Sequence, residues 1–142
     1  MRKLRILLVD DSQSIRSLIR SFIEEDFNSE EFDAEVFEAG DGEAAEQVLQ
    51  EQNVLLEPID IVFLDWMMPK LSGYGLLKRI RSTGGFFKQP AVVMLTAETY
   101  FDQIEACMKF RVSKYITKPF SNSEIRVAIE EIIEDLGVKR AV

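Results

Sequence analysis

The chain has 142 residues, of which 46% are hydrophobic and 30% are charged, and these proportions are typical of one globular domain. Its net charge of −8 argues against nucleic acid as a general partner, because binding to phosphates requires a basic surface. The absence of histidine and the single cysteine exclude Ser-His-Asp triads, nearly all zinc sites and an internal disulfide. Any acid–base or metal chemistry must therefore use carboxylates, lysine, tyrosine or hydroxyl groups.

Short apolar segments of strand length alternate with helix-length segments along the chain. The predicted strands are Arg5–Val9, Ala34–Glu38, Ile59–Leu64, Ala91–Leu95 and Lys114–Thr117. The first, third and fourth are almost continuously apolar, as central strands of a parallel sheet should be, whereas the second is mixed and fits a sheet edge. This alternation predicts an α/β fold in which helices cover both faces of a five-stranded parallel sheet.

Apolar periodicity and capping residues mark the helices between these strands. The segment after the first strand carries apolar residues at helical spacing: Ile15, Leu18, Ile19, Phe22 and Ile23. Ser12 or Ser14 can cap this helix, and Asp41 begins the second. Ser121 and Glu124 have the spacing of a capping box and open the last helix.

Polar residues gather at the carboxyl ends of the predicted strands, where ligands bind in open parallel sheets. Asp10 and Asp11 follow the first strand, Asp65 the third, Thr96 the fourth and Lys118 the fifth. In a sheet of order 2-1-3-4-5 the third strand lies about 4.8 Å from the first, so Asp65 should face the acidic pair. Three carboxylates this close raise one another's pKa values unless a cation is present. Oxygen ligands without histidine or cysteine favour Mg²⁺ (or Mn²⁺).

Such a site could accept a phosphoryl group. A divalent ion and Lys118 would stabilise its oxygens, and the Thr96 hydroxyl would donate a hydrogen bond to it. Asp65 is the natural nucleophile, because an aspartate can form an aspartyl phosphate. Taken singly, an Asp after a strand is more often a helix cap, and a lone Lys or Thr there belongs mostly to a loop or turn. Their shared position at one end of the sheet favours the phosphoacceptor interpretation.

The segments "ILLVDDS", "IVFLDWMMPKLSGYGLL", "VVMLTA" and "YITKPF" resemble the receiver domains of two-component response regulators, and the resemblance covers nearly the whole chain. It implies a flavodoxin-like (βα)5 fold with a doubly wound sheet of order 2-1-3-4-5. By this resemblance Asp65 takes a phosphoryl group from a histidine kinase or a histidine phosphotransfer protein. Asp10 and Asp11 match the acidic pair that holds Mg²⁺, with Asp11 favoured as the direct ligand, and Met67 matches the residue that lends the metal its backbone carbonyl.

The resemblance also implies a conformational switch. Thr96 matches the switch hydroxyl, Lys118 the phosphate-binding lysine, and Pro119 the proline that usually follows a cis peptide bond. Tyr115 matches the switch aromatic, whose ring enters the space that Thr96 vacates, so that the surface of the fourth helix, fifth strand and fifth helix changes and binds a downstream protein. Trp66 should lie at the rim of the site.

Some positions depart from the family pattern. The turn before the fifth strand lacks the glycine usually found near Arg111, and the fourth helix, expected over 98–110, must end without it. The segments "EEDFNSEEFD" and "QEQNVLLEP" are longer than the usual connections. Met67 and Glu98 occupy positions that tune hydrolysis of the phosphoryl group in the family. An apolar Met67 cannot orient an attacking water, which predicts slow self-dephosphorylation.

We therefore expect a single receiver domain over 1–142, with no output domain visible, that acts as a signalling phosphoacceptor rather than as an enzyme. No apolar stretch approaches the roughly 20 residues that span a bilayer, and the N-terminus lacks a signal-peptide pattern, so the expected location is the cytoplasm. Two alternatives remain open. One is an Asp-nucleophile phosphohydrolase of the haloacid dehalogenase type, which requires a general acid at the position of Ser12. The other is a binding module of the same fold that works without phosphorylation.

Overall fold

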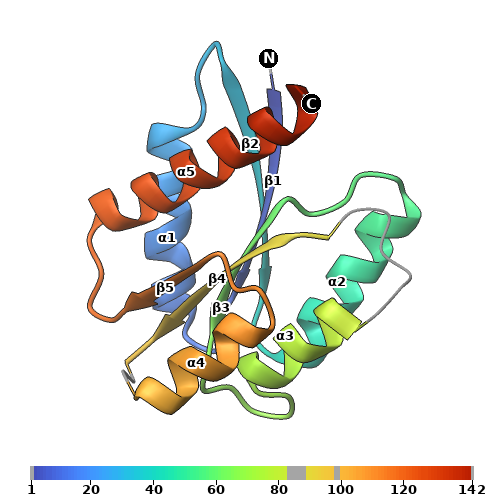
Figure 1. The fold of residues 1–142 in the computed structure, drawn as a ribbon. Coiled ribbons are helices and arrows are strands. Elements are labelled where there is room, and N and C mark those ends of the chain that lie inside the picture. Colours follow the sequence, from blue (N-terminus) through green and yellow to red (C-terminus); the bar gives the residue numbers. More distant parts are fainter. Residues whose placement is uncertain (1, 83–88, 98–99, 142) are drawn as a thin grey trace.

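The computed structural model describes residues 2–82, 89–97 and 100–141, and the side chains of all of these except 137–141. Strands and helices alternate strictly along the described chain (Figure 1). The elements are β1 (Arg2–Val9), α1 (Gln13–Asp26), β2 (Phe32–Ala39), α2 (Gly42–Val54), β3 (Ile61–Asp65), α3 (Gly73–Ser82), β4 (Ala91–Thr96), α4 (Phe101–Lys109), β5 (Lys114–Thr117) and α5 (Asn122–Ala141). None of the described helices is long and apolar enough to cross a membrane.

The five strands form one parallel sheet of order β2-β1-β3-β4-β5, which confirms the predicted fold and strand order. Helices α1 and α5 cover one face of this sheet, and α2, α3 and α4 cover the other (Figure 1). Alternate residues of the central strands therefore feed two separate apolar cores. In β3, for example, Phe63 belongs to the α1/α5 core and Leu64 to the α2/α3/α4 core.

Three of the helices begin at the caps that the sequence indicates. The Ser12 hydroxyl accepts the backbone N–H three residues on at 3.3 Å, so Ser12 rather than Ser14 caps α1. The Asp41 carboxylate accepts the corresponding N–H of α2 at 2.8 Å. Before α5, the Ser121 N–H donates to the Glu124 carboxylate and the Glu124 N–H donates to the Ser121 hydroxyl, both at 3.2 Å, which is the predicted capping box.

The strand boundaries differ from the predicted ones in four strands. The strand β2 covers Phe32–Ala39 rather than Ala34–Glu38, and β4 ends at Thr96 rather than Leu95. The strand β1 begins at Arg2 rather than Arg5, because it pairs with β2 along its whole length. The strand β3 begins at Ile61 rather than Ile59 and includes Asp65. Before it, the Asp60 carboxylate accepts the Arg5 backbone N–H at 2.9 Å, which takes the place of a ladder bond. Helix α4 begins at residue 101, and the start expected at 98 lies outside the described residues.

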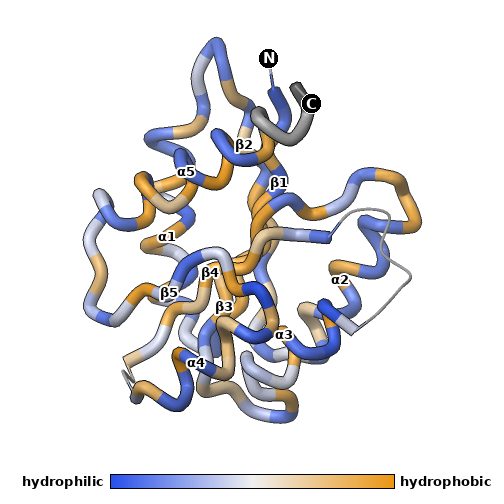
Figure 2. Tube along the Cα trace, in the orientation of Figure 1, coloured by the Kyte–Doolittle hydropathy of each residue, from blue (hydrophilic) through white to orange (hydrophobic). Residues whose placement is uncertain are grey.

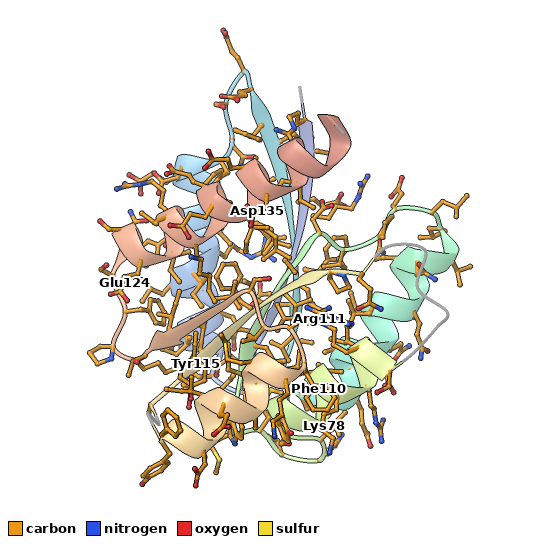
Figure 3. The ribbon with its side chains drawn as sticks, viewed as in Figure 1. Lys78, Phe110, Arg111, Tyr115, Glu124 and Asp135 are labelled. Carbon is orange, nitrogen blue, oxygen red and sulfur yellow. The ribbon has the colours of Figure 1, made fainter. Side chains whose placement is uncertain are left out.

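The turn that joins α4 to β5 forms without the expected glycine. Arg111 adopts the left-handed conformation with φ of 56°, which costs a non-glycine residue about 1 kcal/mol. The Arg81 guanidinium of α3 donates to the carbonyls of Phe110 at 3.0 Å and Arg111 at 3.1 Å, and also to that of Pro90 at 2.7 Å. A side chain from another helix therefore satisfies the carbonyls at the end of α4. Phe110 and Arg111, the two residues of this turn, are labelled in Figure 3.

Candidate functional site

Three carboxylates converge at the carboxyl ends of β1 and β3. The two strands are neighbours in register, with Val9 opposite Leu64, so the residues that follow these positions lie at the same edge of the sheet. One carboxylate oxygen from each of Asp10, Asp11 and Asp65 lies within 4.8 Å of the other two. Asp10 and Asp65 are buried, whereas Asp11 is exposed to solvent. The geometry therefore brings together the three acids that the sequence predicted to meet.

Lys118 brings a positive charge to the same place from the segment after β5. Its Nζ lies 3.0 Å from an Asp10 carboxylate oxygen and 3.5 Å from one of Asp65. Its backbone N–H donates to the Thr96 carbonyl at 2.8 Å, and the peptide bond to Pro119 is cis. Three carboxylates and one ammonium leave a formal charge of −2 at this edge. A divalent cation would balance that charge.

The pKa shifts of Asp65 and Lys118 also indicate a site that lacks positive charge. Burial raises the pKa of Asp65 above its ordinary value, and the neighbouring Asp10 carboxylate raises it further, while Lys118 opposes both effects. Burial acts to lower the pKa of Lys118, but its hydrogen bond to Asp10 and the charges of Asp10 and Asp65 outweigh this, and the net shift is upward. The lysine is therefore held in its charged form, and the Asp65 carboxylate is left short of positive charge.

Asp10 and Asp11 differ in how firmly they are held. One Asp10 carboxylate oxygen accepts the Ser12 backbone N–H at 2.9 Å, and the other accepts from Lys118. The Asp10 backbone carbonyl also accepts a hydrogen bond from the Arg16 guanidinium. The exposed Asp11 carboxylate faces solvent instead. Ser12, where the phosphohydrolase interpretation needs a general acid, has its hydroxyl engaged in capping α1.

The roles of the remaining predicted residues stay predictions, and the structure places all of them except Glu98. Thr96 is the last residue of β4, beside β3, and is 1% exposed. Tyr115 is half-buried on β5, between α4 and the first turn of α5 (Figure 3), and packs against the α2/α3/α4 core.

The Met67 side chain is 66% exposed. Trp66 is half-buried, and its ring stacks on that of Tyr74 at 5.2 Å between centroids. Glu98 lies outside the described residues.

Sequence reasoning missed the contribution of Gly73, the first residue of α3. Its backbone N–H donates to the Trp66 carbonyl at 2.9 Å, and a Cβ atom built on it would lie 2.0 Å from the backbone oxygen of Asp65. The helix therefore begins in direct contact with the end of the strand that carries Asp65. The sequence could have indicated this contact, because Gly73 comes shortly after the strand that carries Asp65. Glycine at the start of a helix is one sign that two backbones approach each other closely.

Comparisons with known proteins identify the family. The model of the response regulator receiver domain matches residues 6–130. The chain is 32% identical to chemotaxis protein CheY-3 of Vibrio cholerae serotype O1 over 136 residues, 95% of each chain. It is 31% identical to transcriptional regulatory protein RprY of Bacteroides fragilis, over 97% of this chain and 52% of that one. The solved receiver domain of a response regulator from Clostridium thermocellum superposes with a TM-score of 0.79 at 27% identity, covering 95% of this chain and 98% of that one. On its fold, its acidic strand-end site and these matches, the chain belongs to the response regulator receiver domain family.

Proposed function

We propose that this protein is a Mg²⁺-dependent phosphoacceptor that takes a phosphoryl group from a phosphohistidine onto Asp65 and signals by binding another protein. The observation that carries the proposal is the placement of Asp65 among Asp10, Asp11 and Lys118 at one end of the sheet. Because these 142 residues contain no histidine, the donor phosphohistidine lies outside them, and a histidine kinase or a histidine phosphotransfer protein would supply it.

The transfer uses the Asp65 carboxylate as the nucleophile. One of its oxygens forms a bond to phosphorus while the phosphorus–nitrogen bond of the donor breaks, and the electron pair returns to the donor imidazole. Lys118 holds its positive charge beside the forming bond, and the Thr96 hydroxyl donates to a phosphoryl oxygen. Burial of Asp65 keeps competing water away from the carboxylate.

The acids form the metal site of this proposal. Asp11 would bind the ion directly, because both oxygens of Asp10 already accept hydrogen bonds, and Asp10 would act partly through water. The Met67 backbone carbonyl would complete the protein ligands. When bound, Mg²⁺ (or Mn²⁺) supplies positive charge that neutralises the phosphoryl oxygens, and oxygen-only ligands of this kind suit it.

An apolar groove beside Lys118 offers the donor protein a place to dock. It has a volume of about 400 Å³ and is lined by Ile15, Leu18, Ala97, Lys118, Pro119 and Phe120. A protein seated in this groove would bring its phosphohistidine to the edge of the sheet where Asp65 lies. The groove is mostly apolar, so contact with the donor would bury hydrophobic surface around the single charged lysine.

The output surface of the proposal is formed by α4, β5 and α5. A second groove of about 310 Å³ runs between β5 and α5 and includes Tyr115 in its lining. Phe101, 76% exposed, and Met108, 64% exposed, add apolar surface on α4. Movement of Thr96 toward the phosphoryl group and of the Tyr115 ring behind it would alter this surface and its affinity for a downstream protein in the cytoplasm.

The direct test is phosphorylation by a small donor. We expect the full chain, incubated with acetyl phosphate and Mg²⁺, to gain one phosphoryl group that survives acid and is lost in base, as an acyl phosphate does. EDTA should prevent the gain in mass. Trp66, the only tryptophan, adjoins Asp65, so its fluorescence should respond first to Mg²⁺ and then to acetyl phosphate or beryllofluoride. A chain that gains no phosphoryl group with Mg²⁺ present would contradict the proposal.

Self-dephosphorylation gives a second prediction, based on Met67. Its exposed thioether cannot hold an attacking water, so Met67→Asn should shorten the lifetime of the phosphoryl group several-fold, since an amide can orient that water. The measurement is the rate of phosphate release from the purified phosphoprotein in Mg²⁺. Met108→Asn, at a comparably exposed methionine on α4, should leave the rate unchanged. Equal lifetimes for the Met67 variant and the native protein would show the prediction to be wrong.

A further inference from the structure

The residues that end α2 form an exposed apolar patch, which we call the α2 tip and define as Val54, Leu55 and Leu56. Their exposed fractions are 79%, 63% and 69%. Figure 2 shows a hydrophobic stretch in the connection that follows α2, at the outside of the molecule. Beside it lies a groove of about 440 Å³ lined by Gln50, Glu51, Gln52, Val54 and Leu55. This volume lies within the range of clefts that bind ligands.

The α2 tip lies far from the phosphoacceptor edge. Helix α2 starts at Gly42, just after the carboxyl end of β2, and runs back toward the opposite end of the sheet (Figure 1). Its 13 residues make it about 20 Å long at 1.5 Å per residue. The patch is therefore separate from both the phosphorylation site and the α4/β5/α5 surface.

The backbone conformation at the α2 tip suits glycine better than the leucine that occupies it. Leu56 has φ of 59°, the left-handed conformation that glycine adopts most easily at the end of a helix. Its N–H donates to the Asn53 carbonyl at 3.1 Å, and the Glu57 N–H donates to the Gln52 carbonyl at 3.0 Å, which is the Schellman pattern. The exposed Leu56 side chain gains little from burial in this conformation. A strained residue that neither packing nor backbone geometry explains points to a function.

We propose that the α2 tip docks an amphipathic helix of another protein, one whose apolar residues are flanked by lysine or arginine. The backbone N–H groups at the tip are used in ending α2, so recognition must proceed through side chains, as when a helix lies in a groove, rather than by strand addition. Glu51 and Glu57 lie on either side of the apolar residues, and α2 carries no lysine or arginine. The Glu57 carboxylate lies 3.8 Å from the Arg5 guanidinium, which offsets part of its charge, whereas Glu51 accepts a hydrogen bond from the neutral Gln47 amide and keeps its full charge. A basic partner complements this charge.

A second copy of this chain fits the α2 tip less well. A two-fold interface places the same patch against itself, so Glu51 and Glu57 of one copy would approach those of the other. Like charges at the rim of an interface disfavour association. The partner is therefore a different protein, and its binding goes beyond the phosphoacceptor function and does not depend on it.

The test uses the full ¹⁵N-labelled chain and a synthetic amphipathic helical peptide built from leucine and lysine. Amide shifts should centre on residues 50–57, and added salt should weaken the binding. Leu55→Ser should weaken it about tenfold, because one buried leucine is lost from the contact. Met108→Ser removes a side chain of matching exposure on α4 and should leave the affinity unchanged. Beryllofluoride should leave it unchanged as well, so the result stands apart from that of the phosphorylation test.

A further variant separates docking from folding. Leu56→Gly should raise the thermal midpoint, because glycine relieves the left-handed strain, and should also weaken peptide binding. A lowered midpoint would mean that Leu56 serves the fold and would overturn the proposal. Amide shifts spread over acidic residues across the whole protein, rather than centred on residues 50–57, would overturn the proposal too. So would a Leu55→Ser chain that binds the peptide with native affinity. So would a concentration-dependent dimer that Leu55→Ser abolishes, since the occupant would then be a second copy.

Discussion

Replacing Asp65 with asparagine is expected to abolish phosphoryl incorporation from acetyl phosphate. The amide oxygen is too weak a nucleophile to form the bond to phosphorus, and the substitution also removes one of the three carboxylates that converge on the site. Intact-protein mass measurement in Mg²⁺ should show no added phosphoryl group. Asp102→Asn, at an exposed aspartate on α4, should label like the native chain. A label that persists in Asp65→Asn would place the acceptor on another acid.

The same substitution should stabilise the protein at neutral pH when divalent cations are removed. Burial and the Asp10 carboxylate raise the folded-state pKa of Asp65 above the ordinary value of 3.8. For a group with a raised pKa, the favourable contribution to stability is complete below the ordinary value and is lost as the pH rises through the folded-state pKa. At pH 7 the native chain therefore holds an unfavourable buried charge, which a neutral asparagine removes.

Thermal unfolding in EDTA checks this at two pH values. Below pH 3.8 the native chain and Asp65→Asn should have similar midpoints, and at pH 7 the variant should be the more stable of the two. Mg²⁺ should then raise the midpoint of the native chain more than that of the variant, because a ligand stabilises the folded state that binds it. A variant that melts below the native chain at pH 7 would show that Asp65 is not held in an unfavourable environment.

The positions of the site acids could be predicted from sequence because they depend on strand ends. Continuous apolar runs locate β1, β3 and β4, and parallel pairing then brings Asp10, Asp65 and Thr96 to one edge whatever the details of packing. The distances between Lys118 and the individual carboxylates could not be predicted in this way. That Lys118 lies closer to Asp10 than to Asp65 depends on how the segment after β5 crosses the edge of the sheet.

The turns were less predictable because their support comes from distant parts of the chain. The sequence showed that a glycine was missing near Arg111 but not what replaces it, since Arg81 lies 30 residues earlier and on another helix. In the same way, the left-handed conformation of Leu56 follows from where α2 ends, and the apolar pattern alone does not fix that residue.

Gly73→Ala is expected to destabilise the protein by about 3 kcal/mol, at the upper end of the usual range for overpacking. The new Cβ atom would lie 2.0 Å from the Asp65 backbone oxygen and 2.8 Å from its carbonyl carbon. Both are backbone atoms of a buried strand, so no side-chain rotation can relieve the contact, and either α3 or the end of β3 must move. Urea denaturation measures the loss. Gly40→Ala should be neutral or slightly stabilising, because its Cβ would meet only the Arg16 guanidinium at 3.7 Å.

Gly73→Ala should also slow phosphorylation, which distinguishes it from other destabilising changes. The displaced atoms belong to Asp65 itself, so the carboxylate moves relative to Lys118 and the acidic pair, and misplacement of a reacting group by about 1 Å can cost a hundredfold in rate. Asp65→Asn should lose phosphorylation while gaining stability, whereas Gly73→Ala should lose both. A Gly73→Ala chain of native stability and native labelling rate would mean that α3 does not press against the acceptor strand. The opposite stability changes of these two variants would separate the chemical role of the Asp65 side chain from the positioning role of the backbone beneath it.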